Sequence, residues 1–289
     1  MLYSELELQL TDEEFRLIRD LIYNHCGLFF DSDSKYLLDR RLLARLAHHN
    51  LSGFREYYQF LKYDRRKDEE IADIMDILTT NETYFFRESF QLRAFTEEIL
   101  PELKLLKQRD QTLRIWSAGC STGEEPYTIA MLMLELDCFR GWRVEIVGSD
   151  ISQRVVQHAR KGIYGKSSFR CTEERYLKRF FTQTEGGYRI CDEVRELVTI
   201  SHMNLFDANR LALLGRMDVI FCRNVIIYFD QDSKKRVIQS FYDMLRGGGY
   251  LLLGHSESLM NVSTAFALKH LKNDMVYQRT AVAYGGATT

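Results

Sequence analysis

Two adjacent carboxylates stand where many nucleotide-binding proteins hold a phosphate. The sequence WSAGCSTGEEPYTIA, which begins at Trp116, places Glu124 and Glu125 directly after a loop of small residues at 119–123. Loops of this kind between a strand and a helix favour anions, because free backbone N–H groups and the helix dipole point toward the ligand. Carboxylates at this position would repel a phosphate and attract a cation. The structural alternative is that the two acids only begin a helix, where the dipole favours them.

A third carboxylate favours the functional interpretation. Asp150 ends the next apolar stretch, in EIVGSD. Nucleoside-binding sheets place an acid at this position, where it accepts hydrogen bonds from the ribose hydroxyls. A nucleoside that carries positive charge and no phosphate fits S-adenosylmethionine, which has an ammonium and a sulfonium group. The acids at 124–125 and 150 together predict this cofactor, with S-adenosylhomocysteine as its product.

The stretches around these acids alternate between short apolar strands and helices. Such alternation predicts an α/β fold with a mostly parallel sheet, helices on both faces and a ligand site beyond the carboxyl ends of the strands. The sequence FALKHLKNDMVYQRT predicts a final hairpin that turns at 272–274 and adds an antiparallel edge. The strands are expected at 113–119, 142–150, 196–205, 217–225 and 247–256.

The first part of the chain follows a different pattern. From about residue 11 to 80, apolar residues recur at helical spacing and indicate consecutive helices. We therefore expect a helical domain at 1–80 and a Rossmann-like domain at 81–289. The segment at about 162–198 fits neither pattern, and we expect it to form a small inserted subdomain.

Composition excludes several classes of function. The chain has a net charge of −2, whereas a general nucleic-acid binder normally has an excess of basic residues. No stretch approaches the roughly 20 apolar residues that a membrane helix needs. The six cysteines form no C-x-x-C pair, so no metal centre is predicted. Acids in the opening MLYSELELQLTDEEF replace the basic and apolar regions of a signal peptide, and a cytoplasmic protein is expected.

Two other enzyme classes that use this kind of sheet agree less well with the residues. A dinucleotide-dependent oxidoreductase should show G-x-G-x-x-G, whereas the loop reads GCSTGEE. A methyltransferase that acts on nucleic acid would need a broader basic surface and aromatic side chains for base stacking.

Four sequence blocks resemble those of the CheR-type methyltransferases, which methylate glutamates of chemotaxis receptors. The blocks occur in the family's order and are TTNETYFFRE from Thr79, WSAGCSTGEEPYTIA from Trp116, IFCRNVIIYFD from Ile220 and GGGYLLLGHSES from Gly247. Together with the helical region before them, the match spans nearly the whole chain. The resemblance implies an all-α domain followed by a Rossmann-like methyltransferase sheet, with S-adenosylmethionine as the methyl donor.

The resemblance also implies roles for individual residues. Arg87 and Tyr228 would be catalytic and would orient the acceptor carboxylate, although Tyr228 taken alone would pass for an ordinary strand-end tyrosine. Glu125, or its neighbour Glu124, would bind the methionine ammonium, and Asp150 would bind the ribose. The other implied cofactor contacts are Asn81, Thr83 and again Arg87 in the linker, Gly119 in the loop, Asn204 and Leu205 beside the adenine, and Cys222 and Arg223 in the pocket wall.

Substrate recognition is expected on the basic helix at 35–49. The family docks this helix on acidic receptor helices, so Arg40, Arg41 and Arg45 are expected to contact the substrate. A solvated basic face is the alternative. The resemblance thus implies the cytoplasmic domains of methyl-accepting chemoreceptors as partners.

The remaining expectations concern assembly and activity. The protein is expected to act as a monomer, without nucleic acid and without membrane insertion. The turn at 184–187 is short compared with family members that tether to a receptor tail, so we expect no such tether. The alternative function is an adaptor of the same fold that binds S-adenosylmethionine for signalling without turnover.

Overall fold

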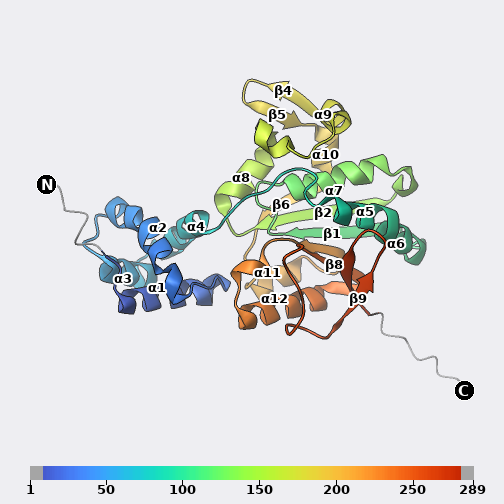
Figure 1. The fold of residues 1–289 in the computed structure, drawn as a ribbon. Coiled ribbons are helices and arrows are strands. Elements are labelled where there is room, and N and C mark those ends of the chain that lie inside the picture. Colours follow the sequence, from blue (N-terminus) through green and yellow to red (C-terminus); the bar gives the residue numbers. More distant parts are fainter. Residues whose placement is uncertain (1–8, 281–289) are drawn as a thin grey trace, which may run out of the picture.

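Four α-helices build the N-terminal part of the chain in the computed structural model, which describes residues 9–280 (Figure 1). Thr11 caps the start of the first helix and forms a capping box with Glu14, and Gly27 caps its end in the left-handed conformation with φ 76°. The helices are α1 (Asp12–Cys26), α2 (Lys35–His48), α3 (Phe54–Tyr63) and α4 (Lys67–Leu78), with a 3-10 turn η1 (Ser32–Ser34) before α2. The domain ends expected at residues 1 and 289 lie outside the described residues.

A seven-stranded sheet follows, in the order β6-β2-β1-β7-β8-β10-β9. Strands β6, β2, β1, β7 and β8 run parallel, and β10 lies antiparallel between β8 and β9. This arrangement confirms the predicted parallel sheet and its C-terminal hairpin. Because the strand order reverses between β1 and β7, a crevice forms at their carboxyl ends. The strands are β1 (Thr112–Ala118), β2 (Arg143–Asp150), β6 (Val198–His202), β7 (Met217–Cys222), β8 (Leu245–Leu253), β9 (Phe266–His270) and β10 (Met275–Arg279).

Helices cover both faces of the sheet, so alternate strand residues belong to two separate cores. Trp116 of β1 packs against Phe241 and belongs to a buried cluster that extends to residues of the N-terminal helices. Its neighbour Ile115 belongs to the second buried cluster, on the other face, together with Phe95 and Ile129. The covering helices are α5 (Ser89–Ala94), the π-helical turn η2 (Phe95–Ile99), α6 (Leu100–Leu106), α7 (Glu124–Glu135), α8 (Gln153–Lys161), α11 (Ala208–Leu213) and α12 (Gln231–Met244), with 3-10 turns η3 (Asp137–Phe139) and η5 (Ile226–Tyr228).

The segment after α8 forms a second, three-stranded antiparallel sheet in the order β3-β5-β4. It stands away from the main sheet at the top of Figure 1. The backbone N–H of Phe85 donates to the carbonyl of Ser168 at 2.9 Å, which joins this subdomain to the linker after α4. Its elements are β3 (Ile163–Tyr164), η4 (Lys166–Phe169), α9 (Glu174–Phe180), β4 (Phe181–Thr184), β5 (Gly187–Ile190) and α10 (Asp192–Glu196).

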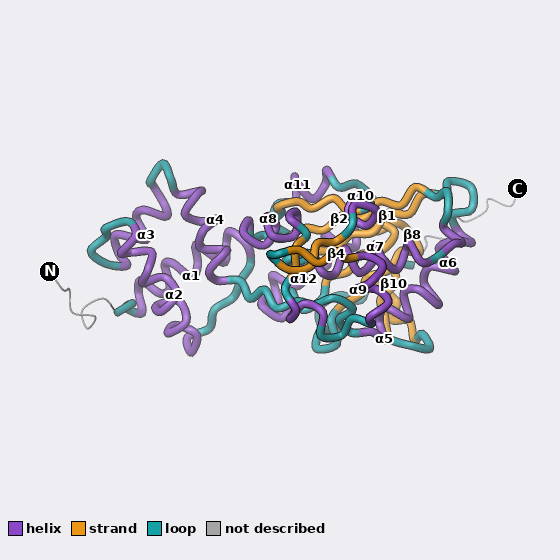
Figure 2. The backbone as a smooth tube through the Cα atoms, turned by 90° about the horizontal axis from the view of Figure 1, so that it is seen from above, coloured by secondary structure: helices purple, strands orange, loops and turns teal. Residues whose placement is uncertain are grey.

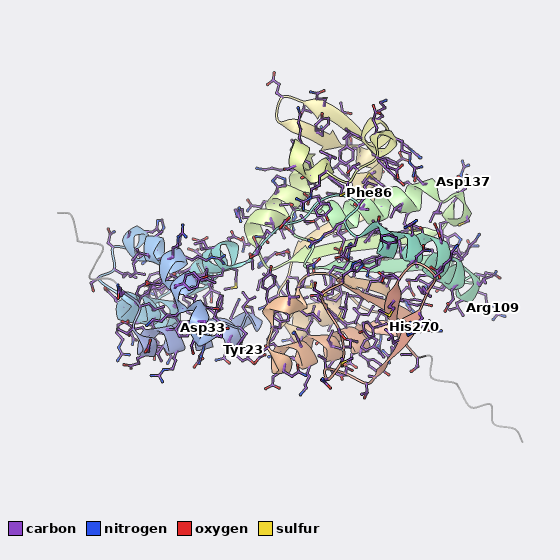
Figure 3. All side chains as sticks on the ribbon, in the orientation of Figure 1. Tyr23, Asp33, Phe86, Arg109, Asp137 and His270 are labelled. Carbon is purple, nitrogen blue, oxygen red and sulfur yellow. The ribbon has the colours of Figure 1, made fainter. Side chains whose placement is uncertain are left out.

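The N-terminal helices lie at one end of the molecule and contact the sheet domain beside α8 and α12 (Figure 2). Tyr23, labelled at this boundary in Figure 3, donates its hydroxyl to Asp230 at 3.0 Å. Asp76 accepts a hydrogen bond from Ser152 Oγ at 2.6 Å. An isolated antiparallel bridge pairs Leu28 with Phe229. Within residues 9–280, none of the helices combines the length and apolar character needed to cross a bilayer.

Candidate active site

A cavity of about 300 Å³ opens at the carboxyl ends of the central strands. Its wall combines the N-terminal helices, the linker after α4, the loop after β1 and the turn after β7. A cavity with contributions from both domains is a typical small-molecule site. The residues predicted from the sequence that line it are Asn81, Thr83, Arg87, Gly119, Glu125, Asp150, Asn204, Leu205, Arg223 and Tyr228, together with Arg41 from α2.

The loop after β1 is shaped by its small residues. The N–H groups of Gly119 and Cys120 both donate to the carbonyl of Ser149, at 2.8 and 2.9 Å. Gly119 has φ 78°, and a Cβ at this position would lie 2.3 Å from the Val225 side chain. A larger residue would therefore push the loop away from the turn after β7.

The two adjacent acids point in different directions. Glu125 lines the cavity and accepts a hydrogen bond from Ser117 Oγ at 2.7 Å. Glu124 is buried and accepts from Thr122 Oγ1 at 2.6 Å and from Ser168 Oγ at 3.0 Å. Burial raises the pKa of the Glu124 carboxyl, and these hydroxyls oppose the shift. Glu124 thus anchors the inserted subdomain, and Glu125 is the acid that faces the cavity.

Asp150 lies at the end of β2, where the sequence places the ribose contact. Its carboxylate accepts the N–H of Ser121 at 2.8 Å and the N–H of Ser152 at 3.0 Å. Burial raises the pKa of Asp150, while the two N–H donors favour its ionised form. These donors fix the carboxylate at the cavity wall.

Arg223 forms an ion-pair network that the sequence did not indicate. Its guanidinium contacts Glu125 at 2.9 Å and Glu88 at 3.0 Å, and it donates to the carbonyl of Arg87. The Arg223 side chain is only 3% exposed, so this pairing is shielded from solvent. Glu88 sits in a left-handed conformation with φ 55°, and no local pattern in the sequence links it to Arg223.

The linker after α4 crosses the loop after β1. The carbonyl of Asn81 accepts from Ser121 Oγ at 3.0 Å. The guanidinium of Arg87 lies 5.6 Å from the centre of the Tyr84 ring and donates to the carbonyl of Glu82 at 3.0 Å. Through these contacts the linker holds Asn81 and Arg87 against the cavity.

Tyr228 reaches the cavity from the 3-10 turn η5. Its side chain is 37% exposed, and its carbonyl accepts the N–H of Phe29 at 3.1 Å. Cys26, Leu28 and Phe29 also line the cavity. The sequence analysis did not predict this contribution of the N-terminal domain to the cavity wall, because the stretch GLFF after the first helix indicates only a loop.

Two expectations from the sequence need correction. Cys222 is fully buried as the last residue of β7 and is not among the residues that line the cavity. Arg45 does not face solvent, because its guanidinium pairs with the buried Glu70 and with Asp73 inside the N-terminal domain.

The other two arginines of the expected docking face also differ from each other. Arg41 lines the cavity and donates to the carbonyl of Leu78 at 2.8 Å. Only Arg40 is exposed. The helix thus offers a substrate fewer free charges than its sequence suggests.

Comparison with known families agrees with this architecture. Residues 81–275 match the family model described as CheR methyltransferase, SAM binding domain. Residues 13–79 match the one described as CheR methyltransferase, all-alpha domain. The chain belongs to the CheR methyltransferase family. This CheR methyltransferase is an S-adenosylmethionine-dependent enzyme. The match confirms the family and the cofactor that were expected from the four sequence blocks.

Individual relatives match over most of their length. A protein named chemotaxis protein methyltransferase 2 from Vibrio cholerae is 37% identical, with 94% of this chain and 95% of the relative covered. A chemotaxis protein methyltransferase from Borreliella burgdorferi is 35% identical over 88% of this chain and 91% of the relative. The protein of that name from Escherichia coli is 34% identical, with 91% and 90% covered.

The cavity of this CheR methyltransferase suits S-adenosylmethionine chemically. Glu125 offers a carboxylate to an ammonium, and Asp150 offers one to the ribose hydroxyls. Asn204 and Leu205 add a polar and an apolar wall. Among the described residues, no group of His, Cys, Asp and Glu side chains is arranged to hold a metal ion.

Proposed function

We propose that this chain transfers the methyl group of S-adenosylmethionine to side-chain carboxylates of glutamates in the cytoplasmic helices of chemoreceptors, giving methyl esters. The observation that carries the proposal is the chemistry of the cavity wall, which contains Glu125, Asp150, Arg87 and Tyr228 but no histidine or lysine among the described residues. A glutamate acceptor suits such a site, because its pKa of about 4.3 leaves it ionised at neutral pH without a general base.

In this proposal, the predicted cavity residues have separate roles. Asp150 holds the ribose, Glu125 holds the methionine ammonium, and Asn204 and Leu205 flank the adenine. When bound, S-adenosylmethionine supplies a methyl group on a cationic sulfur, so that a new oxygen–carbon bond forms as the carbon–sulfur bond breaks. Arg87 and the Tyr228 hydroxyl orient the incoming carboxylate.

Positioning accounts for the rate enhancement in this proposal. Holding two reacting groups in line lowers the barrier by roughly 7–11 kcal/mol at best. The acceptor and the sulfonium carry opposite charges that cancel during the reaction, so excluding water from the cavity favours the transfer. The cavity wall contributed by residues 26–30 serves this exclusion.

We further propose that the enzyme acts as a monomer in the cytoplasm and docks on acidic receptor helices through α2, with Arg40 as the exposed charge. Only Glu185 and Gly186 connect β4 to β5. This short connection supports action without a receptor-tail tether at the inserted subdomain. All the relatives named above are methyltransferases, and none supports a silent adaptor.

Labelled methyl transfer tests the proposed function directly. The purified protein is incubated with radiolabelled S-adenosylmethionine and the receptor fraction of its host, and the labelled protein is treated with mild base. Release of the label as methanol supports glutamate esters. Base-stable label, or no label in the receptor fraction, would reject the proposal.

A further inference from the structure

The turn after β7 is held by a carboxylate outside the cavity. Glu257 accepts the backbone N–H groups of Asn224 at 2.8 Å, Val225 at 2.9 Å and Ile227 at 3.2 Å. It also accepts the N–H of Gly254 at 2.7 Å, from its own segment after β8. Both carboxylate oxygens are used twice, and the donors come from two segments of the chain.

Such a concentration of donors on one anion has a physical reason. Asn224 takes the left-handed conformation with φ 59°, which points successive N–H groups of the turn toward one side. Consecutive N–H groups arranged in this way form an anion-binding concavity, and unpaired backbone donors are costly when shielded from water. Glu257 occupies this concavity from within the chain.

The turn that Glu257 holds carries two residues of the site. Arg223 directly precedes Asn224 and pairs with Glu125 and Glu88. Tyr228 directly follows Ile227 and lines the cavity. A change in the shape of residues 224–227 would therefore move the Tyr228 hydroxyl relative to Arg223.

The position of Gly254 is a second, independent observation that the segment after β8 packs closely against the turn after β7. A Cβ built on Gly254 would lie 2.9 Å from the backbone nitrogen of Asn224 and 2.9 Å from Glu257 Oε2. The two segments thus touch so closely that one of them must lack a side chain at this point. The segment GHSES after β8 fits the turn both through its glycine and through its acid.

We propose that Glu257 is a positioning residue for methyl transfer, which fixes the turn between Arg223 and Tyr228 so that the acceptor carboxylate is held in line. Glu257 itself does not line the cavity. The inference rests on the proposed function for its kinetic consequences. The contact between Glu257 and the turn can be tested without turnover.

Three variants separate positioning from general stability. Glu257→Gln keeps the size of the side chain but replaces one acceptor oxygen by an amide that faces N–H donors. Gly254→Ala keeps the carboxylate and pushes the turn away. The matched control is Glu98→Gln, because Glu98 also accepts backbone N–H groups, from Lys272 at 2.7 Å and Asn273 at 3.1 Å, and both donors lie between β9 and β10 and outside the turn after β7.

Two measurements give the expected pattern. Hydrogen exchange of the peptide that contains residues 224–227 should be faster in Glu257→Gln and Gly254→Ala than in the parent and in Glu98→Gln. The kcat for receptor methylation should fall about 10- to 100-fold in the first two variants, since small misplacements of reacting groups cost rate on this scale. Binding of S-adenosylhomocysteine, measured by calorimetry, should change by a smaller factor than kcat.

Distinct results would overturn the inference. Unchanged exchange at residues 224–227 in Glu257→Gln would show that the carboxylate does not hold the turn. An unchanged kcat in either variant, or an equal loss of kcat in Glu98→Gln, would remove the positioning role. If Glu257→Gln does not fold, the same comparison with Gly254→Ala decides. Absence of any ester with the parent enzyme would instead reject the proposed function and leave the exchange result standing.

Discussion

A guanidinium nitrogen of Arg223 lies 2.9 Å from a carboxylate oxygen of Glu125. The same guanidinium pairs with Glu88, so two partly buried acids share one positive charge. The group of three side chains therefore keeps a net negative charge. This leaves Glu125 able to attract an ammonium even though Arg223 already contacts it.

We predict that Glu125→Gln weakens binding of S-adenosylhomocysteine. A hydrogen bond to a charged group contributes about 1.5–3 kcal/mol, which corresponds to roughly a 10- to 150-fold rise in Kd. Titration calorimetry measures this change. The adjacent Glu124→Gln is the matched control, because Glu124 faces Thr122 and Ser168 instead of the cavity. An equal loss of affinity in both variants would contradict the assignment of Glu125.

We predict that Tyr228→Phe lowers kcat while Kd for S-adenosylhomocysteine stays within a factor of about 3, since the hydroxyl is proposed to act on the acceptor. Steady-state methylation assays and calorimetry give the two values. Tyr63→Phe, which removes a hydroxyl from a side chain that is 67% exposed at the end of α3, is the control. Equal turnover of the Tyr228→Phe variant and the parent would exclude the hydroxyl from the mechanism.

We predict that substitutions of Arg40 and Arg45 in α2 have different effects, the first on receptor binding and the second on stability. Arg40→Ala should raise KM for the receptor, with an effect that shrinks at high salt, because exposed charge contacts are screened. The free energy of unfolding should change by less than about 0.5 kcal/mol, as is usual for a surface substitution. Salt-independent kinetics of the parent would argue against docking through this helix.

Arg45→Ala should instead destabilise the protein. Removing one partner of a buried ion pair costs about 3–5 kcal/mol, because it leaves Glu70 charged and buried. The Glu70 side chain is 1% exposed, so its ion pair with Arg45 counts as a buried pair. Urea denaturation measures the loss, and a difference below about 1 kcal/mol, as found for exposed pairs, would contradict the structural role.

The Glu70 cluster also predicts a pH dependence. Burial acts to raise the pKa of Glu70, but hydrogen bonds from Arg45, Tyr57 and His49 outweigh it, and the pKa is lowered from 4.5. A lowered pKa in the folded state contributes stability above the unfolded value, and this contribution is lost as the pH falls through the folded value. The loss of unfolding free energy in Glu70→Gln should therefore shrink as the pH falls below about 4.5.

Urea denaturation of both proteins over a pH series measures this difference. A difference that stays constant down to acid pH would show that the ionised form of Glu70 is not what the cluster stabilises.

The sheet could be predicted from the sequence because its strands are short apolar runs with helices between them. The stretch at 113–119 corresponds to β1, and the turn at 272–274 lies between β9 and β10. A local pattern determines each of these elements. The cofactor was also accessible from local sequence, because Glu125 and Asp150 each follow directly on a strand or its loop.

The remaining features depend on contacts between distant segments. Helical spacing places Arg41, Arg45 and His49 on one side of α2, but it does not tell whether α4 covers that side with Glu70. Nor does the sequence show that Glu88 and Arg223, which are 135 positions apart, form an ion pair. Such pairs require the folded arrangement of both domains.

The bridge between Leu28 and Phe229 joins the helical domain, which contains the proposed docking helix α2, to the turn that carries Tyr228. A chimaera that takes its first 80 residues from another CheR methyltransferase would exchange the docking helix and the cavity wall in one step. Drift in one half of the gene then selects for compensating changes in the other, so the two halves of such enzymes should evolve as a matched set.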